Sequence, residues 1–199
     1  MLNAQEFVVE MSFLKAIEKE YGKDAKVRFE SLVTLLNELS SEPKPKQLQG
    51  VNDFFNKLSF ETDMIVWRQK DYWASRDEFI GVRSGDCEDY TIAKYFSLQQ
   101  LGFTDDEIFI TYVKAIKYHQ SHMVLSYFKT PSSVPLILDN INKKILPSTR
   151  RRDLRPIFSF NGNKIYRAKQ RGLGKVIPQG KVNLTKWTDL ILKIKKSKN

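Results

Sequence analysis

The only cysteine of this 199-residue chain lies among acidic residues, at the expected start of a helix. It is Cys87, within the segment Gly85-Asp86-Cys87-Glu88-Asp89-Tyr90. A helix N-terminus carries partial positive charge and free backbone N–H groups, which favour a thiolate over a thiol. Cys87 is therefore a candidate nucleophile. The alternative is that Cys87 is a small buried apolar residue and that Asp86 only caps the helix.

The carboxylates beside Cys87 oppose its ionisation and point to a cation among them. Asp86, Glu88 and Asp89 are expected to raise the pKa of the thiol by like-charge repulsion. Their hard oxygen atoms suit Ca²⁺ far better than a soft metal, and the clustered Cys and His spacing of a zinc site is missing. The spacing is not that of an EF-hand loop either. Asp86 and Glu88 are the first candidate ligands, whereas Asp89 is a third candidate that could instead cap the helix.

A cysteine nucleophile needs a general base, and the chain has two histidines, His119 and His122. His122 begins a run of β-branched and aromatic residues that predicts a strand, whereas His119 lies in an expected turn. Because a strand holds a side chain more firmly, His122 is the expected base. Asp139 ends the next apolar run and is expected to accept the Nδ1 proton of His122. The alternative for Asp139 is an ordinary turn after a strand.

These segments resemble the bacterial transglutaminase-like cysteine proteinases. The resemblance covers roughly residues 50 to 165, and the acidic residues around the cysteine are its most specific part. One departure is Met123, where a small residue is expected after the histidine. The resemblance is carried by residues 71–73, 85–90, 93–94, Leu98, 101–102, 122–125, 138–140 and 156–161.

The resemblance implies a papain-like or transglutaminase-like fold and a thiol protease with the catalytic triad Cys87, His122 and Asp139. It further implies a calcium-dependent hydrolase of the periplasm, which controls biofilm attachment by cleaving a large cell-surface adhesin. Cleavage is implied near the adhesin's N-terminus, at a pair of small residues such as Ala-Ala. The implied regulator is an inner-membrane cyclic-di-GMP receptor, whose periplasmic domain sequesters the protease.

Two other function classes stay open from the residues alone. One is transglutaminase-type acyl transfer with the same triad, in which an amine replaces water in the deacylation step. The other is a non-catalytic binding module of the same fold, against which the intact set of three residues argues. The oxyanion is expected to bind the backbone N–H of Cys87 and a second donor, for which Gln69 and Tyr72 are candidates.

The periodicity of apolar residues predicts helices first and strands later, an α+β order. The nucleophile would lie on a helix packed against an antiparallel sheet. We expect one domain over residues 1–199, with a helical lobe over about 1–102 and a sheet-rich lobe over about 103–199. Gly102 is expected to end the cysteine helix in a left-handed conformation. Helices are expected at 5–21, 26–39, 50–58, 75–82, 87–100 and 186–194, and strands at 107–117, 120–128, 136–138, 157–160 and 164–168, with a hairpin turn at 161–163.

Composition excludes several classes of protein. A hydrophobic content of 41% supports a full core, but no apolar run approaches the length of a membrane span. The N-terminus lacks the features of a signal peptide, so export would require a signal that has been removed. The net charge of +10 comes mainly from the C-terminal third, including Arg150 to Arg152. Because no nucleic-acid-binding motif accompanies this charge, we expect a solvated surface rather than a nucleic-acid site. We also expect the protein to be a monomer.

Overall fold

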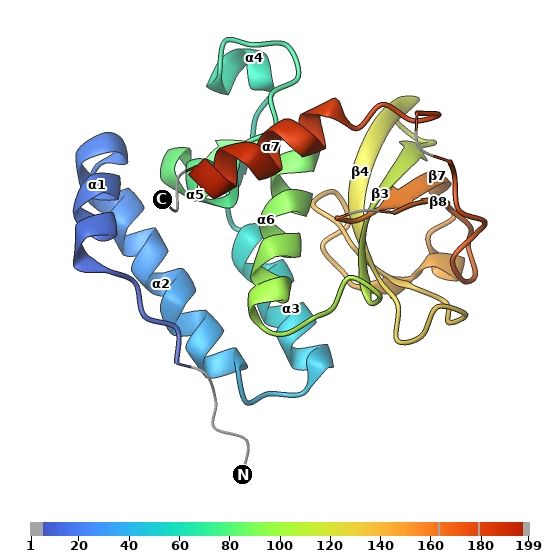
Figure 1. Ribbon diagram of the computed structural model, residues 1–199, viewed down its shortest axis with the longest axis horizontal. Helices are drawn as coiled ribbons and strands as arrows, with labels where there is room; N and C mark the ends of the chain where they lie inside the picture. Colours follow the sequence, from blue (N-terminus) through green and yellow to red (C-terminus); the bar gives the residue numbers. More distant parts are fainter. Residues whose placement is uncertain (1–5, 163, 179, 197–199) are drawn as a thin grey trace.

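The computed structural model describes residues 6–162, 164–178 and 180–196. Helices gather on one side of the molecule and a twisted sheet on the other, with α6 between them (Figure 1). This arrangement confirms the predicted α+β fold. The helices are α1 (Met11–Tyr21), α2 (Lys23–Leu39), α3 (Lys44–Phe55), α4 (Asp63–Val66), α5 (Arg76–Val82), α6 (Cys87–Gln100), the 3₁₀ turn η1 (Ser148–Arg150) and α7 (Thr185–Lys196).

The main sheet has six strands in the order β6-β5-β4-β3-β7-β8, and every neighbouring pair is antiparallel. Helix α6 packs against β4, the strand expected to carry the base. A second sheet, of two short parallel strands, joins β1 to β2. The strands are β1 (Ser59–Phe60), β2 (Ser84–Gly85), β3 (Ile108–Ala115), β4 (Gln120–Tyr127), β5 (Leu136–Leu138), β6 (Leu146–Pro147), β7 (Leu154–Phe160) and β8 (Ile165–Arg167).

Helix α2 begins at Lys23 rather than Lys26, and helices α1 and α3 begin further from their predicted starts. Helix α1 starts at Met11 rather than in the first residues, of which Gln5 lies outside the described part. Asn37 Oδ1 accepts a hydrogen bond from the backbone N–H of Phe7, and Asn37 Nδ2 donates one to the carbonyl oxygen of Phe7. These two bonds hold the segment extended. Helix α3 starts at Lys44, inside the expected connector, because the first turn of a helix tolerates Pro45 without losing a hydrogen bond. Local tertiary contacts and proline chemistry thus decided both starts.

The later elements agree closely with their predictions. Helix α6 runs from Cys87 to Gln100, and Gly102 follows it with a φ of 88°. The predicted hairpin joins β7 to β8, although Asn163 of its expected turn lies outside the described residues. No helix within the described ranges is long and apolar enough to cross a membrane.

The C-terminal helix returns to the helical side of the molecule, where it lies beside α5 and α6 (Figure 1). Trp187 of α7 is 3% exposed, and its ring stacks on Phe96 of α6 at a centroid distance of 5.8 Å. The same ring makes an edge contact with Phe160 of β7 at 5.5 Å. Helix α7 was expected to belong to the sheet-rich lobe, but it packs on the helical side of the molecule. Through Trp187 it contacts both α6 and β7.

Candidate active site

A series of short elements places Cys87 at the first position of α6. Helix α5 begins with a capping box, in which Ser75 and Glu78 satisfy each other's backbone N–H groups. It ends at Arg83, whose φ of 65° reverses the chain into β2. Because β2 pairs with β1, the residues just before Cys87 are held against one neighbouring strand. The rigid turn presents the thiol at the helix N-terminus.

Asp89 organises this turn from within the helix. Its carboxylate accepts hydrogen bonds from the backbone N–H of Ala74 at 2.9 Å and of Asp86 at 3.2 Å. A Cβ atom on Gly85 would lie 2.3 Å from Asp89 Oδ2, so only glycine fits at that position. The capping role considered for Asp89 is thus the one its contacts support.

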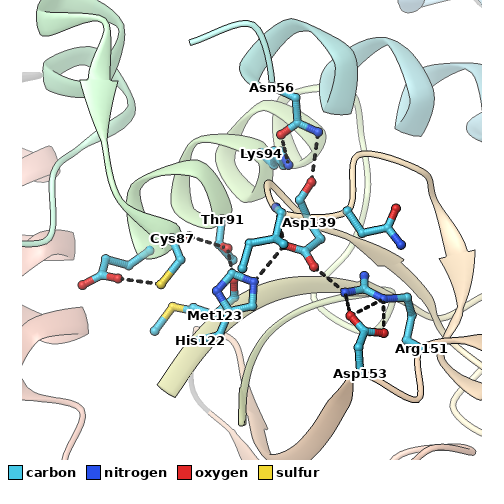
Figure 2. Close-up of polar contacts among 12 residues, drawn as sticks. Asn56, Cys87, Thr91, Lys94, His122, Met123, Asp139, Arg151 and Asp153 are labelled. Carbon is cyan, nitrogen blue, oxygen red and sulfur yellow. Dashed lines mark hydrogen bonds and ion pairs between the residues drawn. The ribbon is translucent and has the colours of Figure 1, made fainter. Parts of the chain in front are cut away.

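His122 lies on β4 and is 2% exposed, whereas His119 is exposed in the turn before that strand. His122 Nε2 hydrogen-bonds to Asp139 Oδ1 at 2.8 Å. The predicted partners are therefore together, but the prediction of Nδ1 as the bonded nitrogen is wrong. In Figure 2 the His122 ring lies between Cys87 and Asp139, which leaves Nδ1 for the thiol.

Asp139 has further partners on each of its oxygen atoms. Oδ1 also accepts the backbone N–H of Ile141 at 3.0 Å, and Oδ2 accepts from Arg151 Nη2 at 2.6 Å. Burial alone would raise the pKa of Asp139, but the hydrogen bond from His122 and the positive charges of His122 and Arg151 hold it well below its ordinary value. These contacts therefore favour the charged form of the Asp139 side chain.

A buried network fixes the backbone of Asp139 from the helical side. Asn56 Nδ2 donates to the carbonyl oxygen of Asp139 at 2.9 Å, and Asn56 Oδ1 accepts from Lys94 Nζ at 2.9 Å (Figure 2). Burial lowers the pKa of Lys94 to about 7, against the effect of the Asp139 charge. Sequence reasoning assigned no role to Asn56 or Lys94. One available signal was that Lys94 lies two helical turns after Cys87, on the same face of α6.

A cleft of about 700 Å³ opens beside the thiol. Trp73 lines it, but neither Gln69 nor Tyr72 is among its lining residues. The Tyr72 hydroxyl instead donates to Glu78 at 2.6 Å, so the suggestion that Tyr72 supplies the second oxyanion donor receives no support from the structure. The cleft is lined by Asp71, Trp73, Cys87, Glu88, Tyr112, Ser121, His122, Met123, Asn183, Leu184, Thr185, Lys186 and Asp189.

Next to Cys87, carboxylates from three segments of the chain lie close enough to share a cation. Asp86 and Glu88 come together with Cys87, and Asp63 lies with Asp71 and Glu88 in one grouping and with Asp86 and Asp89 in another. Sequence reasoning missed Asp63 and Asp71. Asp71 is already paired with a lysine of α7, at 2.6 Å.

The electrostatics of this cluster fit a hard divalent cation. Burial raises the pKa of Asp86 to about 8, with the hydrogen bond and charge of Glu88 adding to it, and burial raises the pKa of Asp63 to about 6. Asp86 Oδ1 and Asp63 Oδ1 are buried and have no hydrogen-bond partner among the described residues. Unpaired buried oxygen atoms are costly, and a cation with oxygen ligands would satisfy them.

The same cluster suppresses ionisation of the thiol. Burial raises the pKa of Cys87 well above its ordinary value, and the charges of Glu88 and Asp86 raise it further. Cys87 Sγ donates to Glu88 Oε2 at 3.1 Å, which favours the protonated thiol. The expectation that neighbouring carboxylates raise the pKa of the thiol is confirmed for Asp86 and Glu88. A cation at Asp86 and Glu88 would reverse this effect.

We predict that Asp139→Asn lowers kcat by about 10³- to 10⁴-fold, because the amide can hold the imidazole in the wrong tautomer. Arg151 keeps its ion pair with Asp153 in this variant, so we expect the protein to remain folded. Steady-state kinetics beside a thermal melt measures both effects. Wild-type kcat in folded Asp139→Asn protein would contradict the orienting role of Asp139.

Comparison with known proteins gives two consistent findings. Residues 22–152 match the family model described as bacterial transglutaminase-like cysteine proteinase. The solved structure of calcium-bound LapG from Legionella pneumophila is 39% identical, with a TM-score of 0.78 over 94% of this chain and 99% of that chain. EGTA-treated LapG from the same organism is 38% identical, with a TM-score of 0.78 over 94% of this chain and 98% of that chain. Curated proteins give no match.

Proposed function

This chain belongs to the bacterial transglutaminase-like cysteine proteinases and is a cysteine protease, and from that premise we propose that Cys87, His122 and Asp139 are its catalytic triad. The observation that carries this proposal is the 2.8 Å bond between His122 and Asp139, beside a cleft that Cys87 and His122 both line. A nucleophile, a base and a group that orients the base are the parts that acyl transfer requires.

In the proposed reaction, Cys87 Sγ attacks the scissile carbonyl carbon while His122 Nδ1 takes the thiol proton. The C–N bond then breaks, the leaving amine takes the proton from His122, and a thioester to Cys87 remains. A water molecule, deprotonated by His122, hydrolyses this thioester and releases the free thiol. Cys87 begins α6, so its backbone N–H lacks an intrahelical partner and can donate to the oxyanion.

We further propose that the carboxylates beside Cys87 bind Ca²⁺. Asp86 and Glu88 are the ligands we assign first; Asp63 groups with each of them, and Asp71 groups with Asp63 and Glu88. Asp89 is a weaker candidate, since it already accepts two backbone N–H groups. The likeness to a LapG structure solved with calcium supports this assignment. Bound calcium would supply positive charge that offsets the field opposing the thiolate.

The biological substrate that we propose is a large cell-surface adhesin, cleaved in the periplasm near its N-terminus. The support is the resemblance of the acidic cysteine segment to the adhesin-releasing branch of the family, and the likeness to LapG over nearly the whole chain. By the same resemblance, the proposed regulator is the periplasmic domain of an inner-membrane cyclic-di-GMP receptor. Cleavage of the adhesin would release cells from a biofilm.

The proposed hydrolysis is tested against acyl transfer with one peptide and one amine. We expect a peptide containing an Ala-Ala pair, incubated with the protein, calcium and a fluorescent amine, to yield two fragments that lack the amine. Mass spectrometry separates the outcomes, because hydrolysis adds water to the cleaved bond and transfer adds the amine. Stable incorporation of the amine as the main product would contradict the proposed protease reaction.

A further inference from the structure

Arg151 is a buried cation in direct contact with the proposed triad. It was expected on a solvated basic surface, but its side chain is 1% exposed. Its Nη2 donates to Asp139 Oδ2 at 2.6 Å, and its Nε and Nη2 donate to Asp153 at 2.9 and 2.7 Å (Figure 2). Arg152, the next residue, is exposed. The 3₁₀ turn η1 ends just before Arg151 and directs only the middle part of this basic run inward.

We propose that Arg151 is a positioning residue, which holds the Asp139 carboxylate toward His122 and offsets its negative charge. This inference rests on the proposed triad and adds a fourth member to it. Arg151 does not touch the thiol or line the cleft beside it, so it acts only through Asp139.

Both oxygen atoms of the Asp139 carboxylate are held by hydrogen bonds. Asp139 Oδ1 binds His122 and the backbone N–H of Ile141, and Arg151 binds Oδ2. With both oxygen atoms held, the carboxylate cannot rotate away from the imidazole. Asp153 is 45% exposed and fixes the guanidinium from the surface side. The planar fork of arginine can bind both acids at once, whereas the single ammonium of lysine cannot match that geometry.

Arg151 also places a positive charge beside the buried carboxylate of Asp139. A buried carboxylate without a cation tends to take up a proton, because burial disfavours its charged form. Arg151 opposes that tendency, in agreement with the low pKa of Asp139. Its charge also repels a proton from the His122–Asp139 pair as a whole.

Stability alone does not account for this arrangement. Burying an ion pair costs desolvation energy, and apolar replacements of such pairs are often as stable. Arg151 also lines a small pocket of about 30 Å³, and its Nη1 has no partner among the described residues. A well-packed apolar side chain would avoid both features. The contact with Asp139 therefore indicates a functional role for the buried guanidinium.

Other charges near the His122–Asp139 pair remain in place when Arg151 is changed. Lys94 of α6 interacts with Asp139 through its charge, and Asp153 interacts with it from beyond Arg151. Across the cleft, the charged or titratable groups are Asp71, Cys87, Glu88, Tyr112, Lys186 and Asp189. A difference between matched Arg151 and Arg152 variants therefore isolates the guanidinium at position 151.

The test compares Arg151→Met with Arg152→Met, which removes the same charge from the exposed neighbour. With calcium at a fixed concentration, we expect Arg151→Met to lower kcat about tenfold or more, with KM within about twofold of wild type. Removing the Arg151 guanidinium should also move the acid limb of the pH profile of kcat/KM to higher pH, by about one unit. Arg152→Met should leave kcat and the acid limb unchanged.

Arg151→Lys separates the charge of Arg151 from its geometry. It should keep the acid limb near its wild-type position but lower kcat, because one ammonium cannot replace the fork. Asp153→Asn changes only a half-exposed partner, so it serves if Arg151→Met fails to fold, and we expect a smaller loss of kcat. Wild-type kcat and an unmoved acid limb in folded Arg151→Met would overturn the inference. If Arg151→Met does not fold, wild-type kcat in both Arg151→Lys and Asp153→Asn would overturn the inference.

Proton NMR makes the test independent of turnover. The chain has two histidine rings to assign, and His119 serves as the internal reference. The downfield signal of the His122 Nε2 proton, which depends on the hydrogen bond to Asp139, should weaken in Arg151→Met but not in Arg152→Met. Such a loss without peptide cleavage by the wild type would contradict the proposed function and still support the role of Arg151. Cleavage by the wild type without any difference between the two variants would contradict the role of Arg151 alone.

Discussion

Cys87→Ala should remove peptidase activity and leave the fold intact. Cys87 is the only thiol, and loss of a nucleophile that acts as one unit with its base lowers kcat by roughly 10⁴- to 10⁶-fold. The side chain is small, half-buried and at a helix end, where alanine is well tolerated. Peptide cleavage assays and a thermal melt measure the two effects. Retained turnover in folded Cys87→Ala protein would exclude a Cys87 nucleophile.

The two histidines provide a matched control for the base. His122→Ala should be inactive, because it removes the group between the thiol and Asp139. His119→Ala should keep near wild-type activity, since His119 is exposed in the turn between β3 and β4. An equal loss in the two variants would show that His122 is not specifically required.

Removal of calcium with EGTA should stop cleavage, and added Ca²⁺ should restore it. Without the cation, burial and the charges of Glu88 and Asp86 raise the pKa of Cys87, so the thiolate is scarce. Mg²⁺ should restore activity poorly, because it requires a tighter octahedral shell and gives up water reluctantly. Calcium should also stabilise the fold by about 2.7 kcal/mol at a hundredfold excess over Kd, measured as a rise in Tm.

Asp86→Asn and Glu88→Gln should weaken calcium binding by about tenfold or more in calorimetry, because each removes a charged oxygen ligand. Asp77→Asn is the control. Asp77 lies in the first turn of the neighbouring helix α5, outside the carboxylate groupings near Cys87. Absence of calcium binding to the metal-free wild type, or equal affinity in all three variants, would contradict the assignment.

The sequence by itself determined which residues could carry the chemistry. One cysteine and two histidines leave few combinations, and a strand pattern distinguished His122 from His119. Apolar periodicity also predicted α6 and the first three strands of the sheet nearly to the residue, because local side-chain spacing reports directly on a helix or strand face. The α+β order followed from these elements.

The tertiary structure decided what depends on contacts between distant segments. Arg150, Arg151 and Arg152 are chemically alike, and only the turn at η1 places Arg151 beside Asp139. Asp63 comes close to Asp86 through α4 and the pairing of β1 with β2. The nitrogen that His122 uses for Asp139 likewise depends on the relative placement of β4 and β5. Sequence patterns report the neighbours of a residue along one element, whereas these contacts arise from packing between elements, which no local pattern records.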